Sequence, residues 1–342
     1  MNSLFDKNLQ IELSDTTCKW KIGQFIYEQL SNRQQIEQFK LEKAERSSLE
    51  NVEIKSFIDG PIWKSLYIYG ESPTCADSHG VNVEIRLYKK EKKIEFIYDM
   101  YKLPVFEPEA VYVAFPFKLS DSKLLFEGQG GIIEPGKDQL PGTSSDWNVI
   151  QNFACIKNNE NQIIFGSEEI PLVHLGGLNM GKFSYYSNPE KPYIFSWVLN
   201  NYWTTNFKAS QEGELKWSYY ITSTDNESSS EATRFGWGSR IPFLTRVLPA
   251  GNNKELLSTK SLLDIDYPNI LLINAKPSID GNGIILLLRE TSGQSTEIDI
   301  SEVLKNNKYN KVSVVNAIEY DLETITSKLV FKPFEAKFVK LY

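Results

Sequence analysis

Residues 81–98, VNVEIRLYKKEKKIEFIY, decide the fold class of this chain. Apolar and polar residues alternate through the first eight positions, and the alternation resumes after the lysine-rich segment 89–93. The apolar positions are Val81, Val83, Ile85, Leu87, Ile94, Phe96 and Tyr98. A period of two places alternate side chains on opposite faces of a sheet. The stretch therefore predicts a β-hairpin with one buried face.

Most of the chain repeats this pattern in short segments separated by Gly, Pro, Asn and Asp. Further strands are predicted at 52–58, 62–69, 111–117, 149–156, 163–166, 193–199 and 214–221. A second set is predicted at 269–275, 283–290, 297–300, 328–331 and 336–342. The polar segment 222–230, TSTDNESSS, is predicted to be an exposed loop and the best internal boundary. Many short strands with turns between them predict an all-β antiparallel sandwich of unusual size.

A single short helix is predicted near residues 31–46. Ser31 and Gln34 have the S-x-x-Q spacing of a capping box. Ile36 and Phe39 give the segment a short apolar face, and Glu42 with Arg46 has the spacing of an i,i+4 ion pair. The helix is expected to lie across a sheet.

Composition excludes several classes of function. The chain has 342 residues, enough for one large domain or two ordinary ones, and 37 Lys plus Arg against 44 Asp plus Glu give a formal charge of −7. This balance argues against a nucleic-acid partner. Apolar runs such as Ile284 to Leu288 are far shorter than the roughly 20 residues of a membrane span. The first residues do not resemble a signal peptide, so a cytoplasmic location is expected.

Metal and nucleophile chemistry find little support in the sequence. His79 and His174 are the only histidines and lie in neither H-x-H nor H-E-x-x-H. Cys18, Cys75 and Cys155 are widely spaced, which predicts three reduced thiols. Glu107, Glu109, Asp138 and Asp146 fall in turn-like segments, where paired carboxylates could cleave a glycoside. In a chain with 44 acids, solvated surface positions are the simpler interpretation.

Two segments combine aromatic rings with amides and a carboxylate, which suits a sugar that stacks on a ring and hydrogen-bonds through its hydroxyls. The candidate carbohydrate-binding residues are Asp146, Trp147, Asn200, Asn201, Tyr202, Trp203 and Asn206. The alternative is that Trp147 and Trp203 are packing residues at strand ends. No catalytic or metal-binding residue is predicted.

Several long segments resemble the C-terminal β-region of bacterial proteins related to glycoside hydrolase family 38, the α-mannosidases. They are PEAVYVAFPF (108–117), KDQLPGTSSDW (137–147), PLVHLGGLNMG (171–181) and LNNYWTTNFKASQEGELKWSYYITS (199–223). SLFDK (3–7) is similar to the turn that opens that region, and KPFEAKFVKLY (332–342) to its closing strand. The resemblance thus extends over essentially the whole chain.

The resemblance implies a galactose-mutarotase-like β-supersandwich over residues 1–240 and a small β-domain over 241–342. It also implies that the catalytic α/β domain and helical bundle, which hold the zinc ligands and the aspartate nucleophile, lie outside this chain. Zinc is therefore expected only in that absent part, and the chain is expected to be a truncated or split product without activity of its own. A missing first strand would leave an unpaired edge or exposed apolar surface, and hence aggregation or dimerisation.

The expected partners are carbohydrate, specifically mannose-containing glycans, and a separately encoded catalytic half. Residues 200–206 are expected to help wall the sugar site, as the family's β-region does. Two alternatives stay open at this point. One is an autonomous carbohydrate-binding module, and the other is an aldose-epimerase-like enzyme with a histidine acid and a carboxylate base.

Overall fold

The computed structural model describes residues 1–38, 44–143, 146–180, 188–204, 206, 208–241, 244–245, 261, 263–265, 267–307 and 309–342. These residues form two compact units. The first comprises Met1–Glu227 with Phe235–Arg240, and the second comprises Ser228–Arg234 with Ile241–Tyr342. Most of the secondary-structure elements in these residues are strands, and all pairings between the strands are antiparallel. The predicted all-β class is confirmed.

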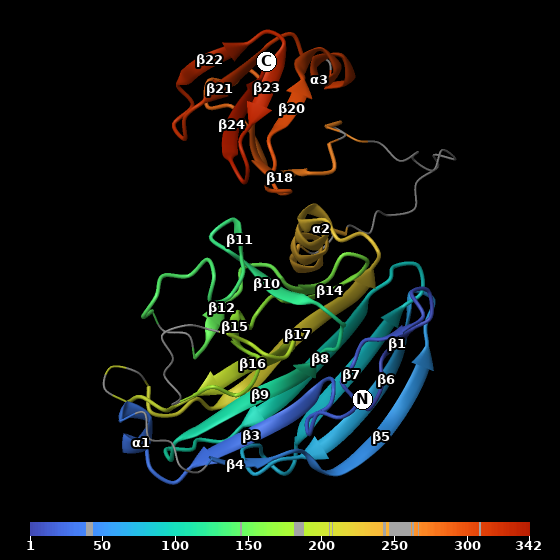
Figure 1. The fold of residues 1–342 in the computed structure, drawn as a ribbon, viewed down its shortest axis with the longest axis vertical. Coiled ribbons are helices and arrows are strands. Elements are labelled where there is room, and N and C mark those ends of the chain that lie inside the picture. The colour runs from blue at the N-terminus through green and yellow to red at the C-terminus, as the bar shows by residue number, and fades with distance from the viewer. Residues whose placement is uncertain are drawn as a thin grey trace, which may run out of the picture. The chain divides into compact units, whose positions relative to one another are not determined.

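The first unit is built on a nine-stranded and a six-stranded sheet (Figure 1). The larger sheet has the order β11-β10-β13-β14-β17-β8-β7-β6-β5. Its strands are β5 (Glu50–Asp59), β6 (Trp63–Glu71), β7 (Val81–Tyr88), β8 (Ile94–Lys102), β10 (Lys123–Gly128), β11 (Gly131–Ile133), β13 (Ala154–Lys157), β14 (Gln162–Ser167) and β17 (Gly213–Thr224).

The smaller sheet has the order β12-β15-β16-β9-β3-β4. Its strands are β3 (Gln24–Leu30), β4 (Ala44–Ser47), β9 (Glu109–Pro116), β12 (Asn148–Val149), β15 (Leu172–Leu175) and β16 (Tyr193–Asn200). A separate two-stranded sheet pairs β1 (Phe5–Asp6) with β2 (Ile11–Glu12).

The core between the two large sheets follows directly from the alternation in the sequence. In the β7–β8 hairpin Val81 and Tyr98 have no exposed surface, and Phe96 is 1% exposed. Opposite them lie inward-facing residues of β3 and β9, including Phe25, Val113 and Phe115. Burying one such side chain contributes about 1.5–3 kcal/mol. The two apolar faces therefore hold the sheets together as a sandwich.

The second unit is a smaller β-structure with its own core. A five-stranded sheet has the order β18-β19-β24-β21-β22, and β20 pairs with β23. The bounds are β18 (Ile270–Pro277), β19 (Ile284–Glu290), β20 (Thr296–Asp299), β21 (Val312–Val315), β22 (Asp321–Ile325), β23 (Lys328–Phe331) and β24 (Ala336–Leu341). Helix α3 (Ile300–Asn307) buries Ile300 and Val303 in this core.

The helix predicted at 31–46 is wrong in extent and in its cap. Helix α1 covers only Gln34–Glu37, and residues 44–47 form strand β4. The Ser31 hydroxyl does not cap it; instead the Asn32 carboxamide oxygen accepts the N–H of Gln34 at 2.9 Å. Arg46 pairs across the sheet with Glu28. Phe39 and Glu42 lie outside the described residues.

The expectation of a single helix is also wrong, because α2 (Ser229–Arg240) and α3 follow β17 and β20. Residues 222–224 of the predicted loop complete β17. A capping signal marks the start of α2, since the Ser228 hydroxyl accepts the N–H of Glu231 at 3.2 Å. Among the residues the structure describes, no helix is long and apolar enough to cross a membrane.

The strand predicted at 149–156 is two strands in different sheets. Strand β12 pairs with β15 in the smaller sheet, whereas β13 pairs with β10 and β14 in the larger one. Between them the chain crosses from one sheet to the other. Strands β1, β2, β3, β4, β10, β11, β15, β21 and β22 were not predicted.

Candidate functional site

The two tryptophans of the predicted carbohydrate site meet in space. Trp147 immediately precedes β12, and Trp203 follows the end of β16. Strand β15 pairs with both β12 and β16, which brings these two segments together. The ring centroids lie 5.7 Å apart with the ring planes tilted by 53°. Both rings are partly buried, so each contributes surface as well as packing.

These rings belong to a larger aromatic cluster on the outer face of the six-stranded sheet, which we define as Tyr112, Trp147, Trp197, Tyr202 and Trp203. Trp197 lies at its centre and is 2% exposed. Its ring is 5.5 Å from Trp147 and 6.3 Å from Trp203 by centroid. Edge-to-face and offset pairs of this kind stabilise by about 0.5–1.5 kcal/mol each beyond their burial. The five rings are therefore packed against one another as one cluster.

A buried carboxylate lies beneath the aromatic cluster. Glu28 on β3 is fully buried and accepts hydrogen bonds from the hydroxyls of Tyr112 and Tyr202. The guanidinium of Arg46 on the neighbouring strand β4 pairs with its other oxygen. Burial, together with the nearby Glu28 carboxylate, raises the pKa of both tyrosines well above the usual range. Both phenols consequently stay protonated and hold the carboxylate in place.

The side chain of Asn201 joins two backbone segments through hydrogen bonds. Its carboxamide oxygen accepts the backbone N–H of Glu109 at 2.8 Å. Its amide nitrogen donates to the carbonyls of Val105, Glu107 and Ala209 at 2.9, 2.9 and 3.1 Å. The side chain is thus occupied by the backbone of two loops and holds the start of β9 against the segment after β16.

The remaining predicted residues differ in exposure. Asp146 is 6% exposed and Tyr202 has no exposed surface, whereas Asn200 is half-buried and Asn206 is exposed. The carboxamide oxygen of Asn200 accepts the N–H of Tyr202 at 3.3 Å. Among the predicted site residues, Trp147, Trp203 and Asn200 are therefore partly exposed and Asn206 is exposed.

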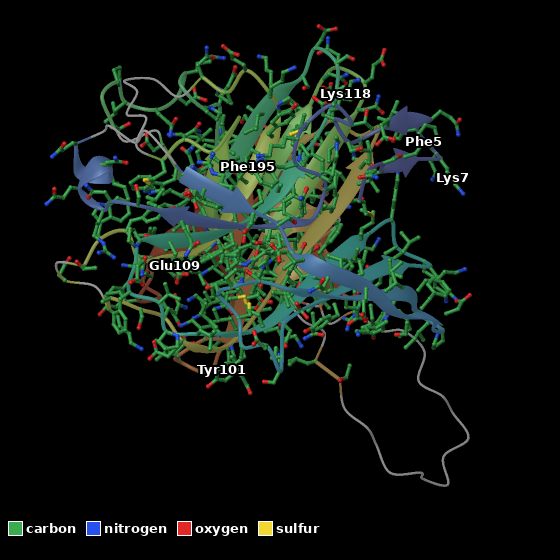
Figure 2. The ribbon with its side chains drawn as sticks, turned by 90° about the horizontal axis from the view of Figure 1, so that it is seen from below. Phe5, Lys7, Tyr101, Glu109, Lys118 and Phe195 are labelled. Carbon is green, nitrogen blue, oxygen red and sulfur yellow. The ribbon has the colours of Figure 1, made fainter. Side chains whose placement is uncertain are left out.

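The carboxylates considered for acid–base work do not form a catalytic pair in this arrangement. Glu109, labelled in Figure 2, is 1% exposed, and its carboxylate pairs with the Lys102 ammonium at 2.6 Å. Its second oxygen accepts the hydroxyls of Tyr27 and Thr74 at 2.8 and 3.0 Å. Glu107 is exposed, and Asp138 accepts the N–H of Glu134 at 2.8 Å in a turn. Glu109 and Asp138 are therefore held in structural contacts, and Glu107 is solvated.

The residues that the structure describes do not fit a zinc site. His79 pairs with Asp99 at 2.5 Å, and His174 is fully buried with its Nδ1 accepting the N–H of Asn179 at 3.0 Å. No group of three or more His, Cys, Asp or Glu side chains within the described ranges could hold a metal ion. His174 is also completely buried, so it does not contact a dissolved sugar. The acid of an epimerase would have to make that contact.

The cysteines are buried or half-buried thiols. Burial raises the pKa of Cys75 and of Cys155 to about 12, so neither thiol ionises at neutral pH. Cys18 is half-buried. None of these environments resembles that of a catalytic nucleophile.

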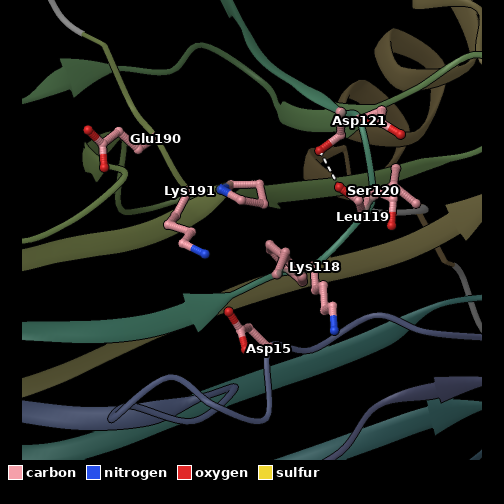
Figure 3. Close-up of a pocket in the computed structure, with 10 residues that line it drawn as sticks. Asp15, Lys118, Leu119, Ser120, Asp121, Glu190 and Lys191 are labelled. Carbon is pink, nitrogen blue, oxygen red and sulfur yellow. Dashed lines mark hydrogen bonds between the residues drawn. The ribbon is translucent and has the colours of Figure 1, made fainter.

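An open pocket of about 300 Å³ lies at the end of β9 (Figure 3). Asp15, Lys118 and Lys191 line it, together with Glu190 and Asp121. Hydrogen bonds from Thr17 and Tyr193 lower the pKa of Asp15 to about 2, so this carboxylate is ionised at neutral pH. Three carboxylates and two ammonium groups therefore share the pocket lining.

Comparison with known proteins agrees with this fold. Residues 1–164 match the family model described as the glycosyl hydrolases family 38 C-terminal domain. This part of the chain is thus similar to the C-terminal domain of family 38. No curated protein sequence matches it significantly.

Solved structures share the fold over nearly the whole chain. An α-mannosidase from Enterococcus faecalis V583 superposes with a TM-score of 0.74 at 13% identity, covering 99% of this chain and 40% of that one. A glycosyl hydrolase family 38 protein from Enterococcus faecalis gives 0.72 at 11% identity, covering 99% and 42%. This chain thus spans about two fifths of each of those structures.

Sequence reasoning missed the residues beneath and at the centre of the aromatic cluster, namely Glu28, Arg46, Tyr112 and Trp197. One signal was present in FIYE, residues 25–28, where a glutamate directly follows three apolar residues. A charged residue in such a run indicates a paired, buried carboxylate. The identity of its partner depends on sheet pairing and is not visible locally.

Proposed function

We propose that this chain serves as the C-terminal β-region of an α-mannosidase-like protein of family 38. In this role it supports a catalytic part and contributes residues 200–206 to the wall of the sugar site. The observation that carries the proposal is the likeness over 99% of the chain to the structure of an α-mannosidase. The family model over residues 1–164 supports the same assignment.

The local geometry supports a wall rather than a catalytic centre. Asn201 fixes the segment after β16 to the start of β9 through four hydrogen bonds to backbone groups. Trp203 rests on the buried Trp197, 6.3 Å away by centroid. A segment held this firmly can present a ring and amides to a sugar without moving. Within the described part of the chain, no ligand set accompanies it that could bind zinc.

The test is hydrolysis of nitrophenyl α-mannoside by the purified chain, with and without added zinc. We expect no release of nitrophenol above the rate in buffer. Zinc-dependent release that follows the chain through purification would overturn the proposal, since the catalytic residues would then lie in this chain.

A second candidate function is autonomous binding of mannose-containing glycans, and one observation favours it. Trp147 and Trp203, which are 56 positions apart in sequence, form adjoining, partly exposed rings. A sugar could stack on this surface while Asn200 and Asn206 supply hydrogen-bonding groups.

Calorimetric titration with mannose, mannobiose and yeast mannan tests this second candidate. Binding should weaken at least tenfold in Trp203→Ala and remain unchanged in Trp63→Ala, which removes a half-buried tryptophan from β6. An absence of heat at millimolar ligand, or equal affinity in both variants, would remove it.

A further inference from the structure

Strand β5 forms one edge of the nine-stranded sheet, and within the described part of the chain neither of its faces is covered. It pairs with β6 on one side, and Figure 1 shows it outermost in the sheet. All of its residues, from Glu50 to Asp59, are exposed. A strand of this length presents unpaired N–H and C=O groups along its free side, ready for another strand.

The apolar face of the core continues onto β5. One row across the sheet runs from Phe96 through Ile85 and Leu66 to Phe57. Phe96 is 1% exposed, whereas Phe57 at the end of the row is 62% exposed. The core-facing side of the nine-stranded sheet is therefore covered at its centre by the six-stranded sheet and is exposed at β5.

A second row shows the same gradient. It runs from Tyr98 through Val83 and Ile68 to Ile54. Tyr98 has no exposed surface, Val83 is 6% exposed and Ile54 is 71% exposed. Two adjacent apolar rows ending in solvent form a patch of the kind that marks an interaction surface.

The order of charges along β5 identifies the partner. Glu53 and Lys55 flank Ile54, pair with each other within the chain and point to the opposite face, where Lys55 lies over the ring of Tyr69. If a second copy of β5 pairs antiparallel about Ile54, each Glu53 lies opposite a Lys55 of the other copy, and Ile54 faces itself. Opposite charges and apolar residues that face each other directly stabilise an antiparallel pair.

We propose that β5 is a self-association surface through which two copies of this chain join their nine-stranded sheets, antiparallel and centred on Ile54. The contact is isologous, so the two-fold axis creates both Glu53–Lys55 pairs at once. The apolar row ending at Ile54 then continues into Ile54 of the second copy. This inference does not depend on the proposed function.

Charge reversal tests both the dimer and its register. Sedimentation equilibrium of the full chain from about 1 to 100 μM should show a concentration-dependent dimer. Glu53→Lys places lysine opposite lysine twice, and Lys55→Glu places glutamate opposite glutamate twice. Each should weaken dimerisation about tenfold or more. An equimolar mixture of the two variants should restore it, because in the mixed pair two lysines of one copy face two glutamates of the other.

Matched controls exclude an effect of net charge. Glu212→Lys and Lys208→Glu change the charge equally at an exposed ion pair elsewhere in the first unit and should leave dimerisation unchanged. All four positions are exposed, so unfolding midpoints should stay near that of the parent chain.

Three outcomes would overturn the proposal. The first is a parent chain that stays monomeric at 100 μM. In that case the register shifts between Glu50 and Glu53 and between Ile54 and Ser56 would be protective bulges of an edge that avoids pairing. The second is a dimer that survives Glu53→Lys. The third is a mixture that associates no better than either variant alone, which would refute the register centred on Ile54.

Discussion

Replacing Lys102 by methionine should destabilise the first unit strongly. The Lys102 side chain is fully buried, and its ammonium contacts the Glu109 carboxylate at 2.6 Å and the Leu103 carbonyl at 2.6 Å. Methionine keeps most of the aliphatic volume but removes the charge. The Glu109 carboxylate would then remain inside the protein with only the hydroxyls of Tyr27 and Thr74 as side-chain donors.

The expected magnitude follows from the burial of both partners, whose side chains are 0% and 2% exposed. Removing one partner of a buried ion pair costs about 3–5 kcal/mol, because an uncompensated charge is left in the interior. Against a total stability of about 5–15 kcal/mol, this is a large loss. Replacing Glu109 by glutamine in the same chain removes the unpaired buried charge. The double variant should therefore lose at least about 2 kcal/mol less than the sum of the single variants.

Urea unfolding followed by tryptophan fluorescence measures this loss in the relevant unit. All seven tryptophans lie in the first unit, so the signal reports on it alone. Lys208→Met is the control, because its pair with Glu212 is exposed and should contribute no more than about 1 kcal/mol. A loss in Lys102→Met as small as in this control, or strict additivity in the double variant, would refute the reasoning.

Three further predictions concern other parts of the fold. In helix α2, Gly236→Ala should destabilise the first unit by more than about 1 kcal/mol, because the added Cβ would lie 2.8 Å from a backbone oxygen. Gly238→Ala should instead stabilise by about 0.5–1 kcal/mol, since nothing lies within 4 Å of its Cβ; urea unfolding compares the two, and equal effects would contradict this packing. Burial raises the pKa of Asp6, but hydrogen bonds from Lys92 and Ser223 outweigh it and lower that pKa from 3.8 to about 2. The resulting stability, about 1–2 kcal/mol, is present above pH 4 and lost as the pH falls towards 2. Asp6→Asn should abolish that part of the pH dependence in acid unfolding curves, and an unaltered curve would argue against the ion pair. Finally, iodoacetamide and mass spectrometry should show one labelled thiol, Cys18, in the folded chain and three in urea, because the other two cysteines are buried; labelling of all three without urea would show that those two sites open.

The fold could be predicted where one face of a strand meets solvent. The hairpin at 81–98 shows clear alternation because its outer face is polar, and its predicted strands correspond to β7 and β8. Strand β3 has no such alternation. One of its faces packs in the sandwich core and the other under the aromatic cluster, so Phe25, Ile26 and Tyr27 are apolar at consecutive positions. A run of this kind carries no periodic signal.

The candidate site could be predicted in composition but not in geometry. Trp147 and Trp203 stood out because each has polar neighbours, yet their meeting depends on the non-local pairing of β12, β15 and β16. Asn201 stood out as an atypical core residue, and its amide is occupied by backbone groups that no local pattern reveals. Arg46 was assigned a neighbour four residues away, whereas it pairs with Glu28 on the adjacent strand.

The proposal that this chain supports catalysis without carrying it is tested most directly by measuring zinc and turnover in the same sample. The purified chain is dialysed against zinc, passed through a desalting column, analysed for metal, and assayed on nitrophenyl α-mannoside. We predict far less than one zinc per chain and no nitrophenol release. One tightly bound zinc per chain together with turnover that a chelator abolishes would contradict the claim.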